Sequence, residues 1–422
     1  MAFASPKFVW RAVLLSFLIQ VAAIGVTHSY RFRTTDSHFA FGWEMGCIGR
    51  SLAEGRGFSD PFCVPSGPSA WEPPLYPYLI GGLFRLLGVY SNASAWVLLS
   101  INSLFASFTC VPIYTIARKL FGDVVARWSV WTWALLPYTW YWSIHWPWDT
   151  TISPFLLASI TAAALDLEEE SGVKGWVTFG ALWGILALCN PSTLSFLPCC
   201  GLWICFRRWR RGLGMVRGPV LASLVFLLCV GPWLARNYVT FGRLVFIRDD
   251  FGQQLRLGNG PYAGGISMAY LQPNLNPSEL ARFRSMGELA YAEQRKREAW
   301  QFIRDNPGRF LAISLKRVVY YWADIPQVDT GRVKEFLRTS SYLASSVLAL
   351  WGLLRALRKR KPGAGLLGLL VLSFPAIYYV VYPHPRYRHV IEPELLIFAV
   401  FLVSETETAP GRRAAASPEP TA

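Results

Sequence analysis

The chain has few charged residues for its length. Only 16% of its 422 residues are Asp, Glu, Lys or Arg, against roughly 25% in an ordinary soluble domain. Hydrophobic residues make up 53%, and apolar runs of about 18 residues or more recur along the chain. This composition excludes an ordinary soluble globular protein. It predicts an all-α protein that crosses a membrane many times.

The cysteines and histidines lack the spacing of a metal-binding motif. The chain has 8 cysteines and 5 histidines, and no two cysteines form a Cys-x-x-Cys pair. We therefore predict no defined metal site, while a divalent ion stays open as a cofactor. Cys47 and Cys63 share a polar segment. They can form a disulfide if that segment lies outside the cell.

The excess of positive charge does not indicate nucleic-acid binding. The net charge is +15, but the basic residues are scattered among links between apolar runs and do not gather on one soluble domain. An excess of Lys and Arg in cytoplasmic links is what orientation in a bilayer requires. We predict membrane lipids and no nucleic acid as partners.

The apolar runs predict ten transmembrane spans in one domain, residues 1–404, followed by a disordered cytoplasmic tail, 405–422. The spans are about 10–28, 93–117, 123–141, 149–166, 174–189, 191–206, 216–236, 338–356, 364–382 and 389–404. A cytoplasmic N-terminus places the basic links RRWRRGLGMVRG and RALRKRKPG inside, as the positive-inside rule requires. Two long loops, 29–92 and 237–337, then lie outside, which predicts an inner (plasma) membrane protein whose site faces the exterior.

The outer loops contain helical patterns. Residues 45–55 have an amphipathic pattern, and residues 73–88 form an apolar stretch too short and too rich in glycine to span comfortably, which predicts a helix along the surface. Residues 278–322 read as helix with a break at Asn306-Pro307-Gly308. The outer loops are thus predicted to be folded.

Two acids stand out on the outer side. Glu44 is the only acid between residues 37 and 53. It is either a solvated surface residue or a general base that removes the proton of an attacking hydroxyl or amine. Asp36 is the alternative base. Asp149 follows the Trp-rich link at 137–148 and is either the N-cap of the next helix or an acid that lines the site.

The stretch YPHPRYRH, 382–389, places cations between two apolar segments. If its backbone is extended, Arg386 and Arg388 point the same way, and paired guanidinium groups bind phosphate oxygens well. Lipid headgroup phosphate and a specific substrate phosphate are both open as the anion. The predicted substrate-binding residues are Arg386, Arg388, His384, Tyr387, His145 and Arg256.

Several stretches together resemble one enzyme family. They are EMGCIGRSLAEGRGFSDPF, PPLYPYLIGGLFRLLG, GPWLARNYVTFGRLVFIRDDFGQQLRLGNG, NPGRF and PRYRHVIEP. Their order is similar to that of the GT-C membrane glycosyltransferases, in the bacterial group of protein O-mannosyltransferases and lipid A aminoarabinose transferases. Many members have adjacent acids in the first outer loop, whereas this chain has Phe-Gly-Trp-Glu.

The resemblance implies a polyprenyl-phosphate sugar as donor and an extracytoplasmic protein, lipid or glycan as acceptor. It implies catalytic acids, which map best onto Glu44 and Asp149, and arginines that hold the donor phosphate, here Arg386 and Arg388. The expected reaction is a single displacement that inverts the sugar. The alternative is a transporter or flippase for a lipid-linked saccharide, which also needs an outer phosphate site.

Overall fold

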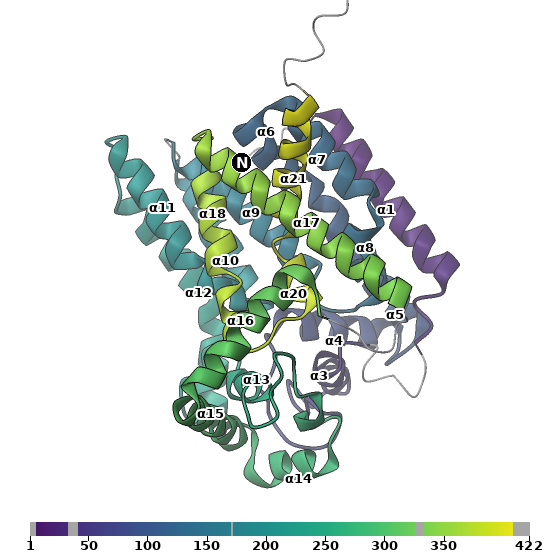
Figure 1. Ribbon diagram of the computed structural model, residues 1–422. Helices are drawn as coiled ribbons and strands as arrows, with labels where there is room; N and C mark the ends of the chain where they lie inside the picture. The colour runs from purple at the N-terminus through teal and green to yellow at the C-terminus, as the bar shows by residue number, and fades with distance from the viewer. Residues whose placement is uncertain (1–5, 33–40, 170–171, 326–331, 408–422) are drawn as a thin grey trace, which may run out of the picture.

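The computed structural model describes residues 6–32, 41–169, 172–325 and 332–407. Within these ranges the chain is helical and contains no strand beyond one isolated bridge between Ser59 and Pro68. The helices form a long bundle with a cap of shorter helices at one end (Figure 1). The predicted all-α fold of a polytopic membrane protein is confirmed.

The bundle is built from helices that match the predicted spans. Each of the ten predicted spans coincides with one or two helices: α1 Lys7–Thr27, α5 Asn92–Phe108, α6 Cys110–Phe121, α7 Asp123–Leu135, α8 Pro137–His145, α9 Ile152–Leu167, α10 Val173–Cys189, α11 Leu197–Arg210, α12 Arg217–Phe241, α17 Arg332–Arg358, α18 Ala364–Ser373, α19 Ala376–Val380 and α21 Glu392–Glu407. The tail beyond Glu407 lies outside the described residues.

Four helical segments of the described chain are long and apolar enough to cross a membrane on their own. They are Lys7–Thr27, Asn92–Phe121, Arg217–Phe241 and Arg338–Arg358. The span expected at 123–141 is instead divided into α7 and α8, because Leu136 precedes Pro137 and takes an extended backbone.

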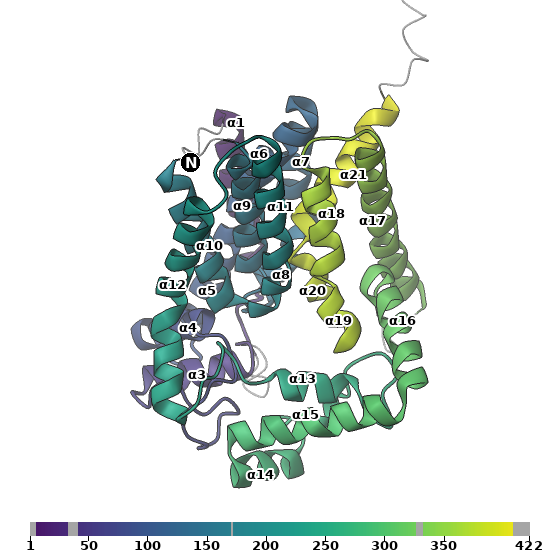
Figure 2. The ribbon, with the colours of Figure 1, turned by 90° about the vertical axis from the view of Figure 1, so that its left-hand side faces the viewer.

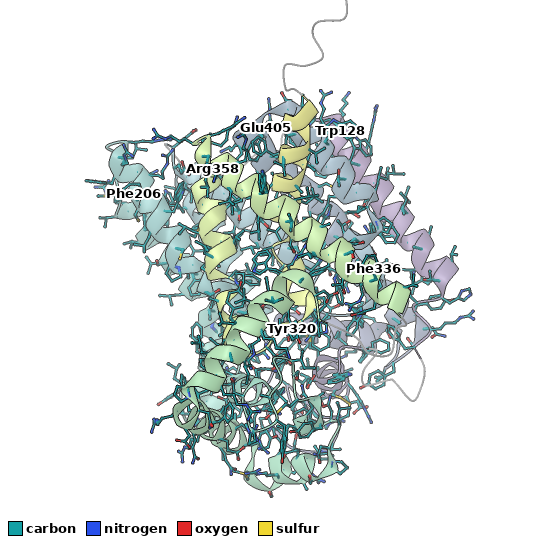
Figure 3. All side chains as sticks on the ribbon, in the orientation of Figure 1. Trp128, Phe206, Tyr320, Phe336, Arg358 and Glu405 are labelled. Carbon is teal, nitrogen blue, oxygen red and sulfur yellow. A yellow bond between two sulfur atoms is a disulfide. The ribbon has the colours of Figure 1, made fainter. Side chains whose placement is uncertain are left out.

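The two ends of the bundle differ in their chemistry. At the end that carries the N-terminus, Arg207 pairs with Glu168 at 2.9 Å and Arg355 pairs with Glu405 at 3.2 Å. Arg358 and Glu405 mark this end in Figure 3. The basic links predicted to be cytoplasmic therefore lie together at one end, opposite the helices of the two long loops.

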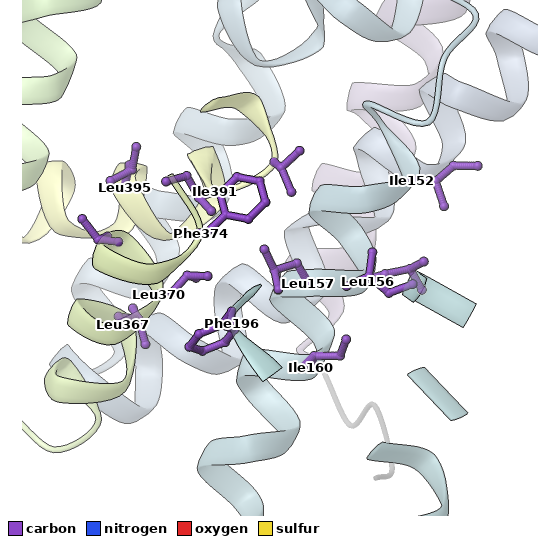
Figure 4. Close-up of a cluster of buried hydrophobic side chains, with 14 of the residues drawn as sticks. Ile152, Leu156, Leu157, Ile160, Phe196, Leu367, Leu370, Phe374, Ile391 and Leu395 are labelled. Carbon is purple, nitrogen blue, oxygen red and sulfur yellow. The ribbon is translucent and has the colours of Figure 1, made fainter. Parts of the chain in front are cut away.

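The core of the bundle is apolar and joins helices far apart in the sequence. Figure 4 shows Leu367 and Leu370 of α18, and Phe374 directly after it, beside Phe196 and Leu157. These side chains are all buried. Their burial fixes α18 against α9 and the turn before α11, so the chain that follows α18 reaches the cap in a defined position.

The cap contains the remaining helices: α3 Glu44–Ala53, α4 Leu75–Leu87, α13 Phe251–Gly258, α14 Pro277–Met286, α15 Glu288–Asp305, α16 Pro307–Ala323 and α20 Pro385–His389. The predicted break at Asn306 separates α15 from α16. A second break, at Gly287, has a backbone φ of 78°, a conformation that glycine adopts easily.

Two contacts hold the first outer loop. A disulfide joins Cys47 to Cys63. Glu288, at the start of α15, accepts hydrogen bonds from the Ser69 hydroxyl at 2.6 Å and from the backbone N–H of Ala70. The two long loops are therefore packed on each other and form one cap.

Candidate functional site

A cavity of about 610 Å³ lies where the cap meets the bundle. Its wall is built from five segments: 43–45, 72–73, 146–150, 189–195 and the region 248–272, and it is closed by the stretch 377–390. Figure 2 shows α13 below the lower end of α19. The volume is in the range of sites for small molecules and cofactors.

Glu44 lines the cavity from the first residue of α3. The turn before it needs Gly42, whose φ is +79° and whose missing Cβ would lie 2.6 Å from the carbonyl oxygen of Pro147. Trp43 also has a positive φ, 47°, which is an uncommon and strained conformation for a bulky residue. The close approach brings the first outer loop against the 146–150 link.

Glu44 is buried, with only 6% of the residue exposed. Burial, and then the nearby charge of Glu72, raise the pKa of Glu44 to about 8. Arg386 and Arg248 act in the opposite direction. A carboxylate with this pKa is a much stronger proton acceptor than an ordinary glutamate once it is ionised.

Asp149 lines the same cavity. Its carboxylate accepts a hydrogen bond from the Ser153 hydroxyl at 3.3 Å. The alternative role as N-cap is not what the structure shows, because α9 begins at Ile152 with Thr151 as its N-cap residue. Burial raises the pKa of Asp149 to about 6, against the opposing effect of Arg386.

A third acid, Glu72, lines the cavity and was not among the predicted site residues. Arg248 lies 3.8 Å from Glu72 and also pairs with Asp250. The amide of Gln254 donates to Asp250 at 2.7 Å. Burial raises the pKa of Glu72. The sequence signal that could have identified Glu72 is an acid placed directly between Trp71 and Pro73 in an apolar stretch.

Arg386 faces these acids together with Arg248. Its guanidinium lies 4.0 Å from the ring centre of Trp148 and 5.2 Å from that of Tyr387. Tyr387 itself stacks on Tyr378 with ring centres 4.4 Å apart. Within the described chain, the Arg386 Nε–H has no hydrogen-bond partner. The aromatic rings hold the guanidinium in place and leave its buried Nε–H without a partner.

His384 is placed beside Arg386 but contributes no positive charge at neutral pH. Its Nδ1 accepts a hydrogen bond from the backbone N–H of Arg386 at 3.2 Å. Burial, with a smaller effect of the Arg386 charge, lowers the pKa of His384 to about 3. The imidazole therefore caps the turn that carries Arg386.

The backbone expected to be extended at 384–388 is a short helix, α20. Pro385 is its first residue, where a fixed φ suits a helix, and the side chain of His384 caps it. Residues two apart then point about 200° apart around the axis. Arg386 faces the cavity, while Arg388 points away and is fully buried. The expectation that both arginines share one face was wrong.

The other predicted substrate-binding residues are divided. Tyr387 and His384 line the cavity, whereas His145 and Arg256 are not part of its wall. His145 contacts the ring of Tyr141 with centres 4.9 Å apart. Arg256 pairs with Glu298 at 3.2 Å inside the cap. Asp36, the alternative base, lies outside the described residues.

The described side chains do not assemble a metal site. No group of three or more His, Cys, Asp or Glu residues in the ranges given above is arranged to hold an ion. Glu44, Glu72 and Asp149 share one cavity, but they face Arg248 and Arg386 there. Arg248 and Arg386 offset part of the negative charge of these carboxyls and lower their pKa.

Comparison with known proteins gives two findings. Residues 71–235 match the family model described as dolichyl-phosphate-mannose-protein mannosyltransferase. The apo oligosaccharyltransferase of Archaeoglobus fulgidus superposes with a TM-score of 0.55 and 15% sequence identity, over 95% of this chain and 51% of that chain. The chain has the GT-C fold. It spans about half the length of the oligosaccharyltransferase.

The GT-C fold predicted from the order of weak sequence signals is thereby confirmed. ArnT of Cupriavidus metallidurans, bound to undecaprenyl phosphate, superposes with a TM-score of 0.39 and 13% identity, covering 93% of this chain and 77% of that chain. A search of curated proteins found no match. The matched segment 71–235 contains two acids of the cavity, Glu72 and Asp149.

Proposed function

We propose that this GT-C protein is a glycosyltransferase that moves a sugar from a polyprenyl-phosphate donor to an acceptor bound on the capped side of the membrane. The observation that carries the proposal is the cavity at the junction of bundle and cap. It combines buried carboxylates with Arg386, and its wall is otherwise largely aromatic and apolar.

Arg386 supports the donor class. A half-buried guanidinium with an unpartnered Nε–H is poised for an anion, and among the described ion pairs none satisfies Arg386 with a carboxylate. Guanidinium groups bind phosphate oxygens through directed N–H donors. The matched mannosyltransferase family is named for a dolichyl-phosphate sugar, which agrees with a lipid phosphate at this position.

The chemical step follows from the charges in the cavity. The acceptor hydroxyl or amine attacks the anomeric carbon, and the bond between that carbon and the phosphate oxygen breaks. The bonding electron pair leaves with the phosphate, where Arg386 stabilises the growing charge. The acceptor proton goes to Glu44. One displacement without a covalent enzyme intermediate inverts the anomeric centre.

Asp149 has a different role from Glu44 in this scheme. With a pKa of about 6, it is mostly ionised at neutral pH and can accept a hydrogen bond from the acceptor or the sugar. Trp43, Trp146 and Trp148 line the same wall, and aromatic faces suit the C–H face of a sugar ring. The acids thus divide into a proton acceptor and an orienting group.

The orientation of the chain supports an exterior site. The basic links lie at the end of the bundle opposite the cavity, as the positive-inside rule requires. The Cys47–Cys63 disulfide is in the cap, and disulfides persist in oxidising compartments. We therefore place the protein in the inner membrane, with its cavity facing the periplasm or exterior.

The test is transfer by the purified protein in nanodiscs. The full chain is incubated with a polyprenyl phosphate carrying a radiolabelled sugar, and water-soluble or acceptor-linked label is counted. Glu44→Gln and Arg386→Ala are expected to reduce turnover strongly. Glu405→Gln, which removes an ion pair at the opposite end of the bundle, is the matched control and should turn over normally.

Normal turnover in both site variants would refute the assignment. The transporter alternative makes a distinct prediction: labelled lipid-linked sugar would cross the bilayer of proteoliposomes without any covalent transfer. The described membrane helices favour the enzyme, because the charged groups of the cavity gather on one side of the bundle and not at its middle.

A further inference from the structure

Arg388 is the most completely satisfied cation beside the cavity. Its side chain is 0% exposed. Two of its N–H groups donate to the Glu392 carboxylate at 3.0 Å each. The others donate to the Ser345 and Ser346 hydroxyls, both at 2.6 Å, and to the carbonyl oxygen of Tyr342 at 3.2 Å.

These bonds use every donor that the side chain has. A guanidinium carries five N–H groups, and the five bonds above account for all of them. The central carbon of the guanidinium also lies 4.0 Å from the ring centre of Tyr342. Arg388 therefore has no N–H left for a phosphate, in contrast to Arg386 with its unpartnered Nε–H.

The same contacts tie three helices together. Arg388 belongs to α20 and Glu392 is the first residue of α21, while Tyr342, Ser345 and Ser346 belong to α17. Because α20 has a single turn and a half, anchoring Arg388 fixes the direction in which the rest of that turn points. Arg386 lies on the opposite side of it, against Trp148.

We propose that the buried Arg388–Glu392 pair is a positioning device, which anchors α20 to α17 and so aims Arg386 at the donor phosphate. Arg388 acts through Arg386 and does not touch the substrate. This inference rests on the proposed function, because it assigns binding of the donor phosphate to Arg386 alone. A misplacement of about 1 Å at a reacting group can reduce turnover roughly a hundredfold.

The experiment measures binding of undecaprenyl phosphate to the full chain in phosphatidylcholine nanodiscs, with the thermal midpoint recorded for each variant. Because removing one partner leaves a buried charge unpaired, Arg388→Gln and Glu392→Gln are combined. This pair variant is expected to weaken binding at least roughly tenfold, as is Arg386→Ala, because each loses a hydrogen bond between the guanidinium of Arg386 and the phosphate. Glu405→Gln, which removes another α17–α21 ion pair far from the cavity, should leave binding unchanged.

The decisive comparison is the triple variant. If the pair acts through Arg386, adding Arg388→Gln and Glu392→Gln to Arg386→Ala costs no further affinity. Losses that multiply, or a pair variant that binds like the wild type, overturn the inference. Should the pair variant not fold, Ser345→Ala decides: loss of one hydrogen bond predicts a drop of roughly two- to tenfold, and unchanged binding overturns the inference.

The proposed function fails in a different way. If the wild type does not bind undecaprenyl phosphate, or if Arg386→Ala binds it as tightly as the wild type, the donor assignment itself is wrong. If the wild type binds, Arg386→Ala loses binding and the pair variant does not, only the positioning role is wrong.

Discussion

The pH dependence of sugar transfer gives a direct test of the role of Glu44. Its pKa is raised to about 8, first by burial and then by Glu72. If the ionised form is the base, turnover falls as pH falls through that pKa. At pH 7 roughly a tenth of the protein carries an ionised Glu44, and each further pH unit down costs about tenfold.

Two substitutions separate the base from its surroundings. Glu44→Gln removes the base. The pH-dependent change in turnover near pH 8 should then disappear, and turnover should fall by about 10² to 10⁴. Glu72→Gln removes the charge that helps to raise the pKa of Glu44. Glu72→Gln should move the midpoint of the pH-dependent change in turnover to lower pH without abolishing turnover.

The assay is single-turnover transfer of labelled sugar between about pH 5 and pH 10, with donor saturating so that binding does not set the rate. Glu405→Gln serves as the unchanged control. A pH-dependent change in turnover near pH 6 that vanishes in Asp149→Asn would assign the base to Asp149, whose pKa is raised to about 6. It would refute the role given to Glu44.

Three further predictions concern the surroundings of the site. Trp148→Ala removes the ring 4.0 Å from Arg386 and should weaken donor binding by about 1 to 2 kcal/mol, as measured by titration with undecaprenyl phosphate, while Trp148→Phe should retain most of it. Replacing Cys47 and Cys63 by Ser opens a loop of 16 residues and should lower the free energy of unfolding by about 3 kcal/mol; an unchanged melting midpoint would contradict this. Burial raises the pKa of Glu288 to about 8, so its contribution to stability is fully present below its ordinary pKa of 4.5 and is lost as pH rises through about 8. Hydrogen exchange of the cap should rise over that window, and Glu288→Gln should flatten the change.

The sequence located the cap helices well because their signals are local. The amphipathic pattern at 45–55 became α3 and the break at Asn306 was found in place, since helix periodicity and Asn-Pro-Gly act over a few residues. The division of the span at 123–141 also has a local cause, because Pro137 disfavours a helical backbone at Leu136. The prediction missed it because the surrounding run is continuously apolar.

The sequence predicted only part of the site, because some of its contacts join residues far apart in the chain. Glu44 and Asp149 stood out because acids are rare in their stretches, and both line the cavity. Glu72 and Arg248 are 176 residues apart in number, yet they meet at 3.8 Å. Such a pair leaves no pattern in a single sequence, because the contact depends on how the two outer loops pack.

Composition and apolar periodicity by themselves determined that this chain is an all-α membrane protein, because bilayer insertion depends on local hydrophobicity. The placement of basic links predicts its orientation through flanking charge. The tertiary structure decided which polar residues work together. It turned the backbone after Pro385 into a helix, so that Arg386 faces the acids of the cavity while Arg388 is held by Glu392 and α17. Arg386 and Arg388 are identical and only two residues apart, yet their surroundings differ. The direction in which each side chain points depends on the helical backbone and on the elements packed around it, which the adjacent residues do not specify alone.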